Sequence, residues 1–243
     1  MQPKQARLIP GTRHTIGTGQ LAAERALVKL EDGTTLPAVV KTMPAEIIAA
    51  ECFCAILLTA WGVSVPEPLL VTDGDTLLFG SADASYPNLK QRIGMNDAQP
   101  ENIQVAYAVA AAKLVATWEE TPLVIAADEA IDNRDRNLGN ILWDGESRVY
   151  IDHEQALGLS TLPDNNKLAT LISLTGETAR IERSAVSMAL VMSPEMADHA
   201  AASIAPEHGQ RYAEYVRART AALANRVLTR FPKPKDLFTH LPP

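Results

Sequence analysis

Three oxygen-bearing side chains lie close together in one stretch of the sequence. Asp135, Asn140 and Asp152 fall within DNRDRNLGNILWDGESRVYIDHEQA, which spans residues 132–156. Carboxylate and amide oxygens are the ligands that Mg²⁺ prefers, and a carboxylate can also orient a hydroxyl that attacks a phosphate. These residue types therefore indicate a site that holds metal ions against a polyphosphate. The alternative is a surface loop that is merely polar.

The segments between these residues predict a β-hairpin that brings two of them together. Asn140 begins the apolar run NILW, a D-G turn follows, and the run VYID ends at Asp152. Alternating apolar residues on either side of a D-G pair are a strong hairpin signal. Because the second strand runs back along the first, we expect Asp152 to lie close to Asn140.

A second Asp-x-x-x-x-Asn frame competes with the first. Asp132 and Asn137 have the same spacing as Asp135 and Asn140. We prefer the frame of Asp135 because only its asparagine directly precedes the strand, which would fix the direction of the amide oxygen. Asp132 is then interpreted as a residue at a helix end or behind the site.

The predicted secondary structure changes from strands to helices along the chain. Turn signals and apolar patterns predict strands in residues 6–43, a helix from Pro44 to Gly62, two strands in residues 65–82, helices between residues 99 and 131, the hairpin described above, and helices after residue 163. This order indicates an α+β protein with two lobes. We expect an N-terminal lobe of residues 1–82 and a C-terminal lobe of residues 83–243.

With these elements in place, DRNLGNIL followed by YIDHE resembles the catalytic and metal-binding segments of the protein-kinase-like superfamily, most closely those of HipA-like kinases. Similar patterns occur in the phosphatidylinositol 3- and 4-kinases. The resemblance implies that Asp135 is the catalytic acid and that Asn140 and Asp152 bind the metal. Asp152 stands where ordinary protein kinases begin the D-F-G motif, and this chain has D-H-E there. We interpret His153 as a packing or hydrogen-bonding residue.

The resemblance extends to the N-terminal half of the sequence. It implies a two-lobed protein-kinase-like fold, in which an antiparallel sheet and one helix form the N-terminal lobe and the C-terminal lobe is mostly helical. The helix glutamate, the following glycine and the run VPEP are also similar to HipA-like kinases. The nucleotide-binding residues implied are Lys41 on the α- and β-phosphates, Glu51 paired with that lysine, Gly17 and Gly19 over the phosphates, and Phe79, Gly80 and Ser81 in an interlobe linker that binds adenine.

The function implied is an ATP-dependent kinase that uses Mg²⁺ and transfers a phosphoryl group to a serine or threonine hydroxyl of a protein. The partners implied are ATP, a protein substrate and an antitoxin or regulatory protein. Two alternatives stay open: a small-molecule or lipid kinase on the same scaffold, and a nucleotide-binding pseudokinase that acts through partner proteins.

Composition argues against several other classes of protein. The 243 residues include 22 Lys and Arg and 29 Asp and Glu, which give a formal net charge of −7. This balance offers no footprint for direct binding to nucleic acid or to an anionic membrane. Cys52 and Cys54 are the only cysteines, and neighbours two apart on a helix point to different faces. They suit neither a disulfide framework nor a metal site, so we expect a cytoplasmic protein without membrane attachment.

Overall fold

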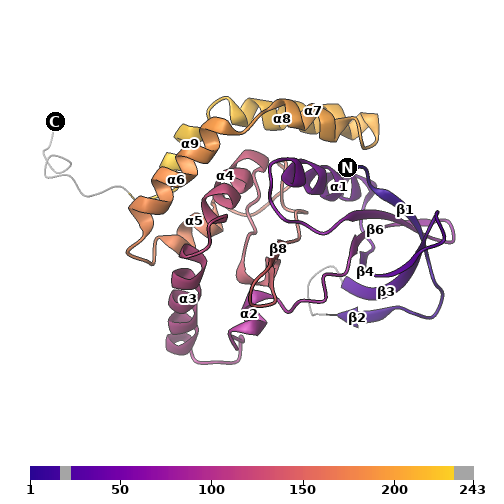
Figure 1. Ribbon diagram of the computed structural model, residues 1–243, viewed down its shortest axis with the longest axis horizontal. Helices are drawn as coiled ribbons and strands as arrows, with labels where there is room; N and C mark the ends of the chain where they lie inside the picture. The colour runs from indigo at the N-terminus through magenta and orange to yellow at the C-terminus, as the bar shows by residue number, and fades with distance from the viewer. Residues whose placement is uncertain (17–22, 233–243) are drawn as a thin grey trace, which may run out of the picture.

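The structure is a computed structural model and describes residues 1–16 and 23–232 (Figure 1). Within these residues, the N-terminal part contains six strands and the helix α1, which comes between the fourth strand and the fifth. The strands are β1 (Lys4–Leu8), β2 (His14–Ile16), β3 (Ala23–Leu30), β4 (Thr35–Lys41), β5 (Pro68–Asp73) and β6 (Thr76–Ala82).

Five of these strands close into a barrel, because β1 pairs with both β3 and β5. The pairs β3–β4, β4–β6, β5–β6 and β1–β3 are antiparallel, whereas β1 and β5 are parallel. The prediction of an antiparallel sheet is therefore wrong for the pair that closes the ring. Strand directions cannot alternate all the way around a closed ring with an odd number of strands, so at least one pair has to be parallel.

The helix α1 (Ala45–Ala60) lies against the barrel on one side and against the C-terminal helices on the other (Figure 1). The ring of Phe53 on α1 packs edge to face against the ring of Tyr212, with centroids 5.6 Å apart. On the barrel side, α1 contributes to a small cluster of buried side chains made of Met43, Ile48, Cys52 and Phe79. The helix is thus buried along most of its length, which explains why its sequence is apolar on nearly every face.

As far as residue 232, the C-terminal part consists of helices and one hairpin, as the sequence predicts. The hairpin pairs β7 (Ile141–Trp143) with β8 (Arg148–Tyr150), and the 3₁₀ turn η1 (Leu138–Asn140) leads into it. The helices are α2 (Leu89–Arg92), α3 (Glu101–Ala116), α4 (Thr121–Ile131), α5 (Lys167–Ile172), α6 (Thr178–Val191), α7 (Glu195–Ala201), α8 (Pro206–Thr220) and α9 (Leu223–Thr229). Among the described residues, none of the helices is both long and apolar enough to cross a membrane.

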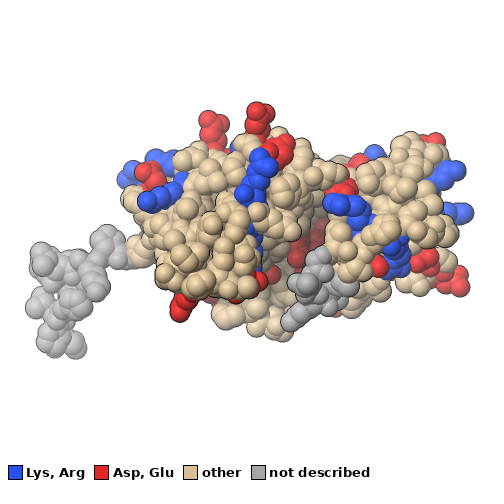
Figure 2. All heavy atoms as spheres, turned by 90° about the horizontal axis from the view of Figure 1, so that it is seen from below, with Lys and Arg blue, Asp and Glu red and all other residues tan. Residues whose placement is uncertain are grey.

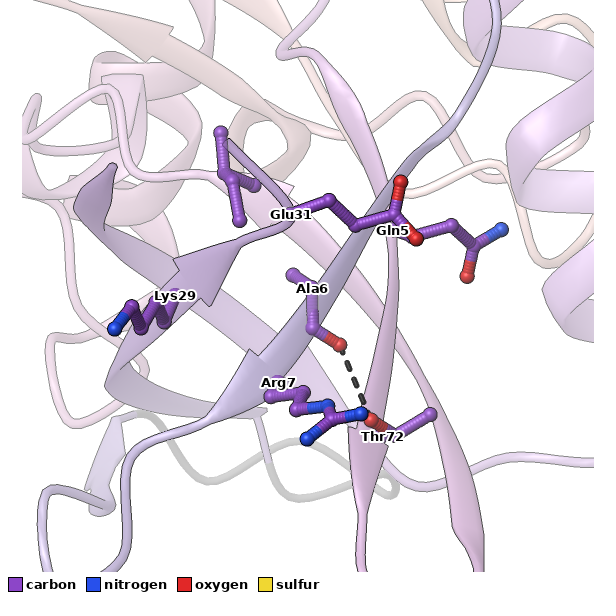
Figure 3. A pocket seen from close by; sticks show the side chains of 7 residues that line it. Gln5, Ala6, Arg7, Lys29, Glu31 and Thr72 are labelled. Atoms are coloured by element: carbon purple, nitrogen blue, oxygen red, sulfur yellow. Dashed lines mark hydrogen bonds between the residues drawn. The ribbon is translucent and has the colours of Figure 1, made fainter. Parts of the chain in front are cut away.

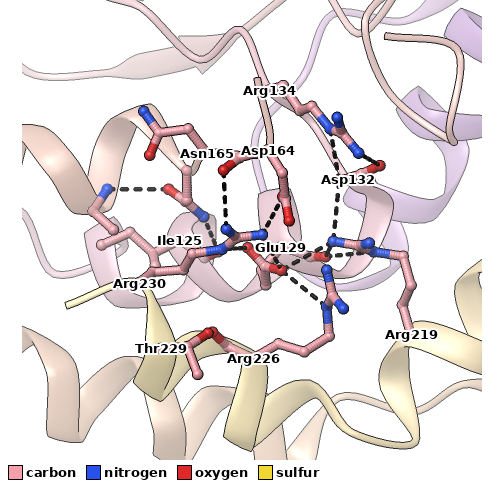
Figure 4. A network of polar contacts seen from close by, with 12 residues as sticks. Ile125, Glu129, Asp132, Arg134, Asp164, Asn165, Arg219, Arg226, Thr229 and Arg230 are labelled. Atoms are coloured by element: carbon pink, nitrogen blue, oxygen red, sulfur yellow. Dashed lines mark hydrogen bonds and ion pairs between the residues drawn. The ribbon is translucent and has the colours of Figure 1, made fainter. Parts of the chain in front are cut away.

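A buried carboxylate on α4 holds the last two helices in place. Glu129 is 2% exposed and accepts hydrogen bonds from three arginines that approach from α8, α9 and the residue after α9 (Figure 4). The distances are 3.0 Å to Arg219, 3.0 Å to Arg226 and 2.7 Å to Arg230. The helix α4 leads directly into the segment of Asp135, so this network fixes the helix from which the candidate site begins.

Candidate active site

The hairpin and the loop before it form one hydrogen-bonded unit. The backbone N–H of Ile151 donates to the carbonyl oxygen of Asn140 over 3.1 Å, which places Asn140 beside the strand end that leads to Asp152. The side-chain amide of Asn140 donates to the backbone carbonyl of Asp135 over 2.8 Å. Its amide oxygen is the atom left to bind a cation. The structure therefore brings the segments of all three residues together.

A buried arginine fixes this unit to the protein core. Arg136 is 2% exposed and forms two hydrogen bonds to the carboxylate of Asp128 on α4, at 3.0 and 3.1 Å. Its third nitrogen donates to the backbone carbonyls of Asn140 and Ile151. A two-point arginine–carboxylate pair is rigid as well as strong. Arg136 thus sets the position of the loop relative to the hairpin.

Asp132, the aspartate of the alternative Asp-x-x-x-x-Asn frame, lies at the end of α4. Asp132 is the C-cap of α4, where its φ of 59° places it in the left-handed region. Its carboxylate pairs with Arg134 and accepts a hydrogen bond from the hydroxyl of Tyr215 over 2.6 Å. Asp132 therefore holds the end of α4, as the sequence interpretation expects of a helix-end residue.

Lys41 is the last residue of β4, and its side chain contacts the segment that follows the hairpin. Its ammonium donates to Asp152 over 2.8 Å and to Glu154 over 3.4 Å. Burial, the largest single effect, lowers the pKa of Lys41, but the nearby carboxylates of Asp152, Glu51 and Glu154 outweigh it and raise the pKa above the ordinary value. Lys41 is therefore a half-buried, charged cation at the centre of the site.

Glu51 faces the same site but does not pair with Lys41 as the resemblance implies. It is 2% exposed, and it accepts hydrogen bonds from the backbone N–H of His153 at 3.0 Å, with the ring Nδ1 of His153 at 3.3 Å. Burial raises the pKa of Glu51, yet the contacts with His153 and the charge of Lys41 bring it below its ordinary value. Among the described residues, no direct hydrogen bond or ion pair joins Lys41 to Glu51. Glu51 bonds to His153 instead, and Lys41 bonds to Asp152 and Glu154. His153 thus acts as the hydrogen-bonding residue that its sequence position suggests.

Three carboxylates form a group that could hold a cation. One oxygen from each of Glu51, Asp152 and Glu154 lies within 4.8 Å of the others. The pKa of Glu154 is raised, first by burial and then by the charge of Asp152. Hard oxygen ligands of this kind suit Mg²⁺, so the residues present fit the metal that the sequence resemblance implies.

Phe79 and Ser81 line a pocket of about 70 Å³ next to this group, and Gly80 does not. Successive residues of a strand face opposite sides, so Gly80 points into the barrel. A Cβ atom on Gly80 would lie 2.6 Å from Cγ2 of Val71, which explains why a glycine is present. The other pocket residues are Val39, Lys41, Glu51, Pro66, Ala82, Asp83, Ala84, Leu142, Ile151 and Asp152. Gly17 and Gly19 lie outside the described residues.

The position of this pocket agrees with the molecular surface. In the view from below, Asp and Glu side chains are set back in a hollow between the barrel and the helical part (Figure 2). A larger hollow of about 540 Å³ lies on the outer face of β1, β3 and β5 (Figure 3). None of the residues that line it belongs to the Lys41 and Asp152 group. The smaller pocket is therefore the candidate site on chemical grounds.

Two residues at the site are missing from the sequence prediction. Glu154, in the D-H-E run, pairs with Lys41, and its acidic side chain two residues after Asp152 was an available signal. Lys167, at the start of α5, forms an ion pair with Asp135. It follows Asp135 by 32 residues. No local pattern links residues that far apart.

The site lies between a small barrel and a helical part. It combines a lysine at the end of a strand, a buried glutamate on the next helix, and two aspartates and an asparagine on a loop and hairpin. This arrangement defines a protein-kinase-like fold of the α+β class.

Solved structures share this fold. The proinflammatory kinase CtkA of Helicobacter pylori has a TM-score of 0.60 and 12% sequence identity, over 92% of this chain and 95% of that chain. HipA of Shewanella oneidensis MR-1, solved with HipB and operator DNA as a toxin–antitoxin system, has a TM-score of 0.53 and 10% identity, over 89% of this chain and 64% of the HipA chain. No family model matches the sequence, and no curated protein is significantly similar to it. The predicted resemblance to HipA-like kinases is confirmed for the fold.

Proposed function

We propose that this protein is an ATP-dependent kinase of the HipA-like type, which uses Mg²⁺ and transfers the γ-phosphoryl group to a serine or threonine hydroxyl of a protein. The observation that carries the proposal is the contact between Lys41 and Asp152, which come from the barrel and from the hairpin. A kinase places a lysine that binds the phosphates and a carboxylate that binds the metal at one site.

The charge balance at the site supports a divalent cation. Glu51, Asp152 and Glu154 contribute three negative charges when ionised, and Lys41 contributes one positive charge, so the group carries −3 + 1 = −2. Buried charge that is left uncompensated is costly. Asp152 and Asn140 would hold Mg²⁺, which supplies charge neutralisation on the phosphates when it is bound.

The other residues would bind and orient the substrates. The adenine would lie against Phe79 and Ser81, and Lys41 would exchange its carboxylate partners for the α- and β-phosphates. Asp135 would orient the acceptor hydroxyl and take its proton. Most of the rate enhancement would come from positioning and from charge stabilisation rather than from covalent chemistry.

We also infer two lobes that meet at residue 82, with residues 1–82 covering the phosphates and residues 83–243 carrying the catalytic loop. The separate buried cluster inside the barrel supports this division. On the likeness to HipA, which was solved with HipB, we propose a protein as the regulatory partner.

Phosphoryl transfer with labelled ATP and Mg²⁺ tests the proposal. The full chain, alone and in cell lysate, is expected to label itself or a protein band. Asp152→Asn should lower the transfer rate by at least about 100-fold, because a metal carboxylate is lost. Asp198→Asn, which removes a carboxylate from an exposed ion pair on α7, is the control and should leave the rate unchanged. Equal rates in the wild type and Asp152→Asn would refute the proposal.

A nucleotide-binding pseudokinase is the second candidate, and the occupied Glu51 favours it. Glu51 bonds to His153 rather than to Lys41, so the lysine–glutamate pair of an active kinase is not formed. This candidate predicts that ATP raises the melting temperature while no acceptor becomes labelled.

A further inference from the structure

Lys167 and Asp135 form an ion pair that joins the candidate catalytic loop to the start of α5. The ammonium of Lys167 donates to Oδ1 of Asp135. The side chain of Lys167 is 38% exposed and that of Asp135 is 27% exposed, so the pair is accessible from solvent. The carboxylate proposed to receive the hydroxyl proton therefore has a cation beside it.

The position of Lys167 is fixed by the residue before it. Asn166 is 2% exposed and caps α5, where its side-chain oxygen accepts a hydrogen bond from the backbone N–H of Ala169 over 3.0 Å. Its amide donates to the carbonyl oxygen of Ile125 on α4 over 3.0 Å. Lys167 is thus held at the first residue of a helix that is anchored to the core.

The other cations around the loop already have partners that hold them in place. Arg136 is buried against Asp128, and Arg134 pairs with Asp132. Lys41 forms ion pairs with Asp152 and Glu154. Within residues 1–16 and 23–232, Lys167 is the one cation that forms an ion pair with Asp135.

We propose that Lys167 binds the γ-phosphoryl group of ATP and neutralises it during transfer, which rests on the proposed kinase function. In the reaction, the acceptor oxygen forms a bond to the γ-phosphorus while the bond to the β–γ bridging oxygen breaks. The bonding electron pair leaves with ADP, and the hydroxyl proton passes to Asp135. Negative charge is spread over the three non-bridging oxygens of the transferred group, and a cation at that position stabilises it.

The ion pair with Asp135 is consistent with this role. A carboxylate oxygen and a phosphoryl oxygen are both anionic acceptors, so the ammonium that binds Asp135 can also bind a phosphoryl group. Lys167 would then turn from Asp135 to the phosphoryl group without leaving its place on α5. The long, flexible lysine side chain permits such a movement.

Affinities for ATP and ADP, each with Mg²⁺, test the contact without knowledge of the acceptor. Lys167→Ala should lose about tenfold of the preference for ATP over ADP, while the affinity for ADP stays within about twofold, because only ATP carries the γ-phosphate. Lys167→Arg should retain most of the preference, since the charge is kept. Lys4→Ala removes an exposed ion pair with Glu67 on the barrel and should change neither affinity.

The rate of transfer from labelled ATP gives a second measurement on the same variants. Lys167→Ala should transfer about 100-fold more slowly than the wild type at saturating ATP, and Lys167→Arg should recover part of the rate. Equal loss of ATP and ADP binding in Lys167→Ala would show a structural role and overturn the inference. A wild-type rate and a wild-type preference for ATP in this variant would also overturn it.

Failure of the inference can be told apart from failure of the proposed function. If the wild type neither binds ATP nor transfers phosphate, both fall together. If the wild type does both and Lys167→Ala behaves like it, only the role of Lys167 falls.

Discussion

At the scale of single residues, the site is defined by which partner each charged group has taken. Lys41 is paired with Asp152 and Glu154, and Glu51 is paired with His153. Nucleotide would compete for Lys41, and a metal ion would compete for the carboxylates. The protein's own carboxylates and ammonium thus pair at the positions where the proposed function places a cation and phosphates.

Gly80 of β6 acts through packing inside the barrel. Gly80→Ala should lower the free energy of unfolding by about 2 kcal/mol, because its Cβ would lie 2.6 Å from Val71 and 3.2 Å from Leu69 inside the barrel. Urea denaturation measures the change. Gly176→Ala, where no atom lies within 4 Å of the added Cβ, should change it by less than about 0.5 kcal/mol. Equal stability of the two variants would contradict the packing role.

At the scale of elements, α4 connects α8 and α9 with the candidate catalytic loop. Glu129 near its C-terminal end holds three arginines, and Asp128 beside it holds Arg136 of the loop (Figure 4 shows the Glu129 side). Adjacent residues of a helix point in different directions, so one helix can serve two networks. The loop before the hairpin and the C-terminal helices are thus both held by α4.

Removal of the Glu129 charge should loosen this support. Glu129→Gln should lower the free energy of unfolding by about 3 kcal/mol, because three arginines lose a buried counter-charge. Urea or thermal denaturation measures the loss. The control is Glu177→Gln, since the ion pair of Glu177 with Arg180 is 52% exposed on both sides and should contribute less than about 0.5 kcal/mol. Comparable losses in both variants would argue against the network.

At the scale of the whole molecule, α1 is the element shared by the barrel and the helical part. Its Ile48 and Cys52 belong to the cluster with Phe79, whereas its Phe53 and Leu57 belong to the large cluster of the C-terminal helices. The same helix carries Glu51 into the site. Ligand binding between the two parts should therefore stabilise the molecule as a unit.

Nucleotide binding should raise the stability of the whole chain, and Lys41 should be required for it. With ATP and Mg²⁺ at 100 times the dissociation constant, the free energy of unfolding should rise by about 2.7 kcal/mol. Lys41→Met should lose most of this gain under the same conditions, whereas Lys29→Met, on the exposed face of β3, should keep it. Thermal unfolding with and without nucleotide measures the effect, and an unchanged gain in Lys41→Met would exclude contact with the phosphates.

Local patterns in the sequence were sufficient for most elements and for the core of the site. The hairpin after Asn140, the helix after Pro44 and the strands around the turn at Gly74 all follow from signals within a few residues. The place of Asp152 beside Asn140 also follows, because a short hairpin leaves its two strands no other arrangement. These predictions depend on chain geometry over short distances, which the amino-acid order specifies directly.

The pairings between distant segments were decided only by the tertiary structure. The parallel pair of β1 and β5 arises from closure of a ring. The ion pair of Lys167 with Asp135 arises because α5 packs against α3 and its cap, Asn166, bonds to Ile125 on α4. Glu51 bonds to His153 because a helix and a hairpin meet there. Charged side chains have several possible partners in a sequence, and the packing of the elements on one another selects among them.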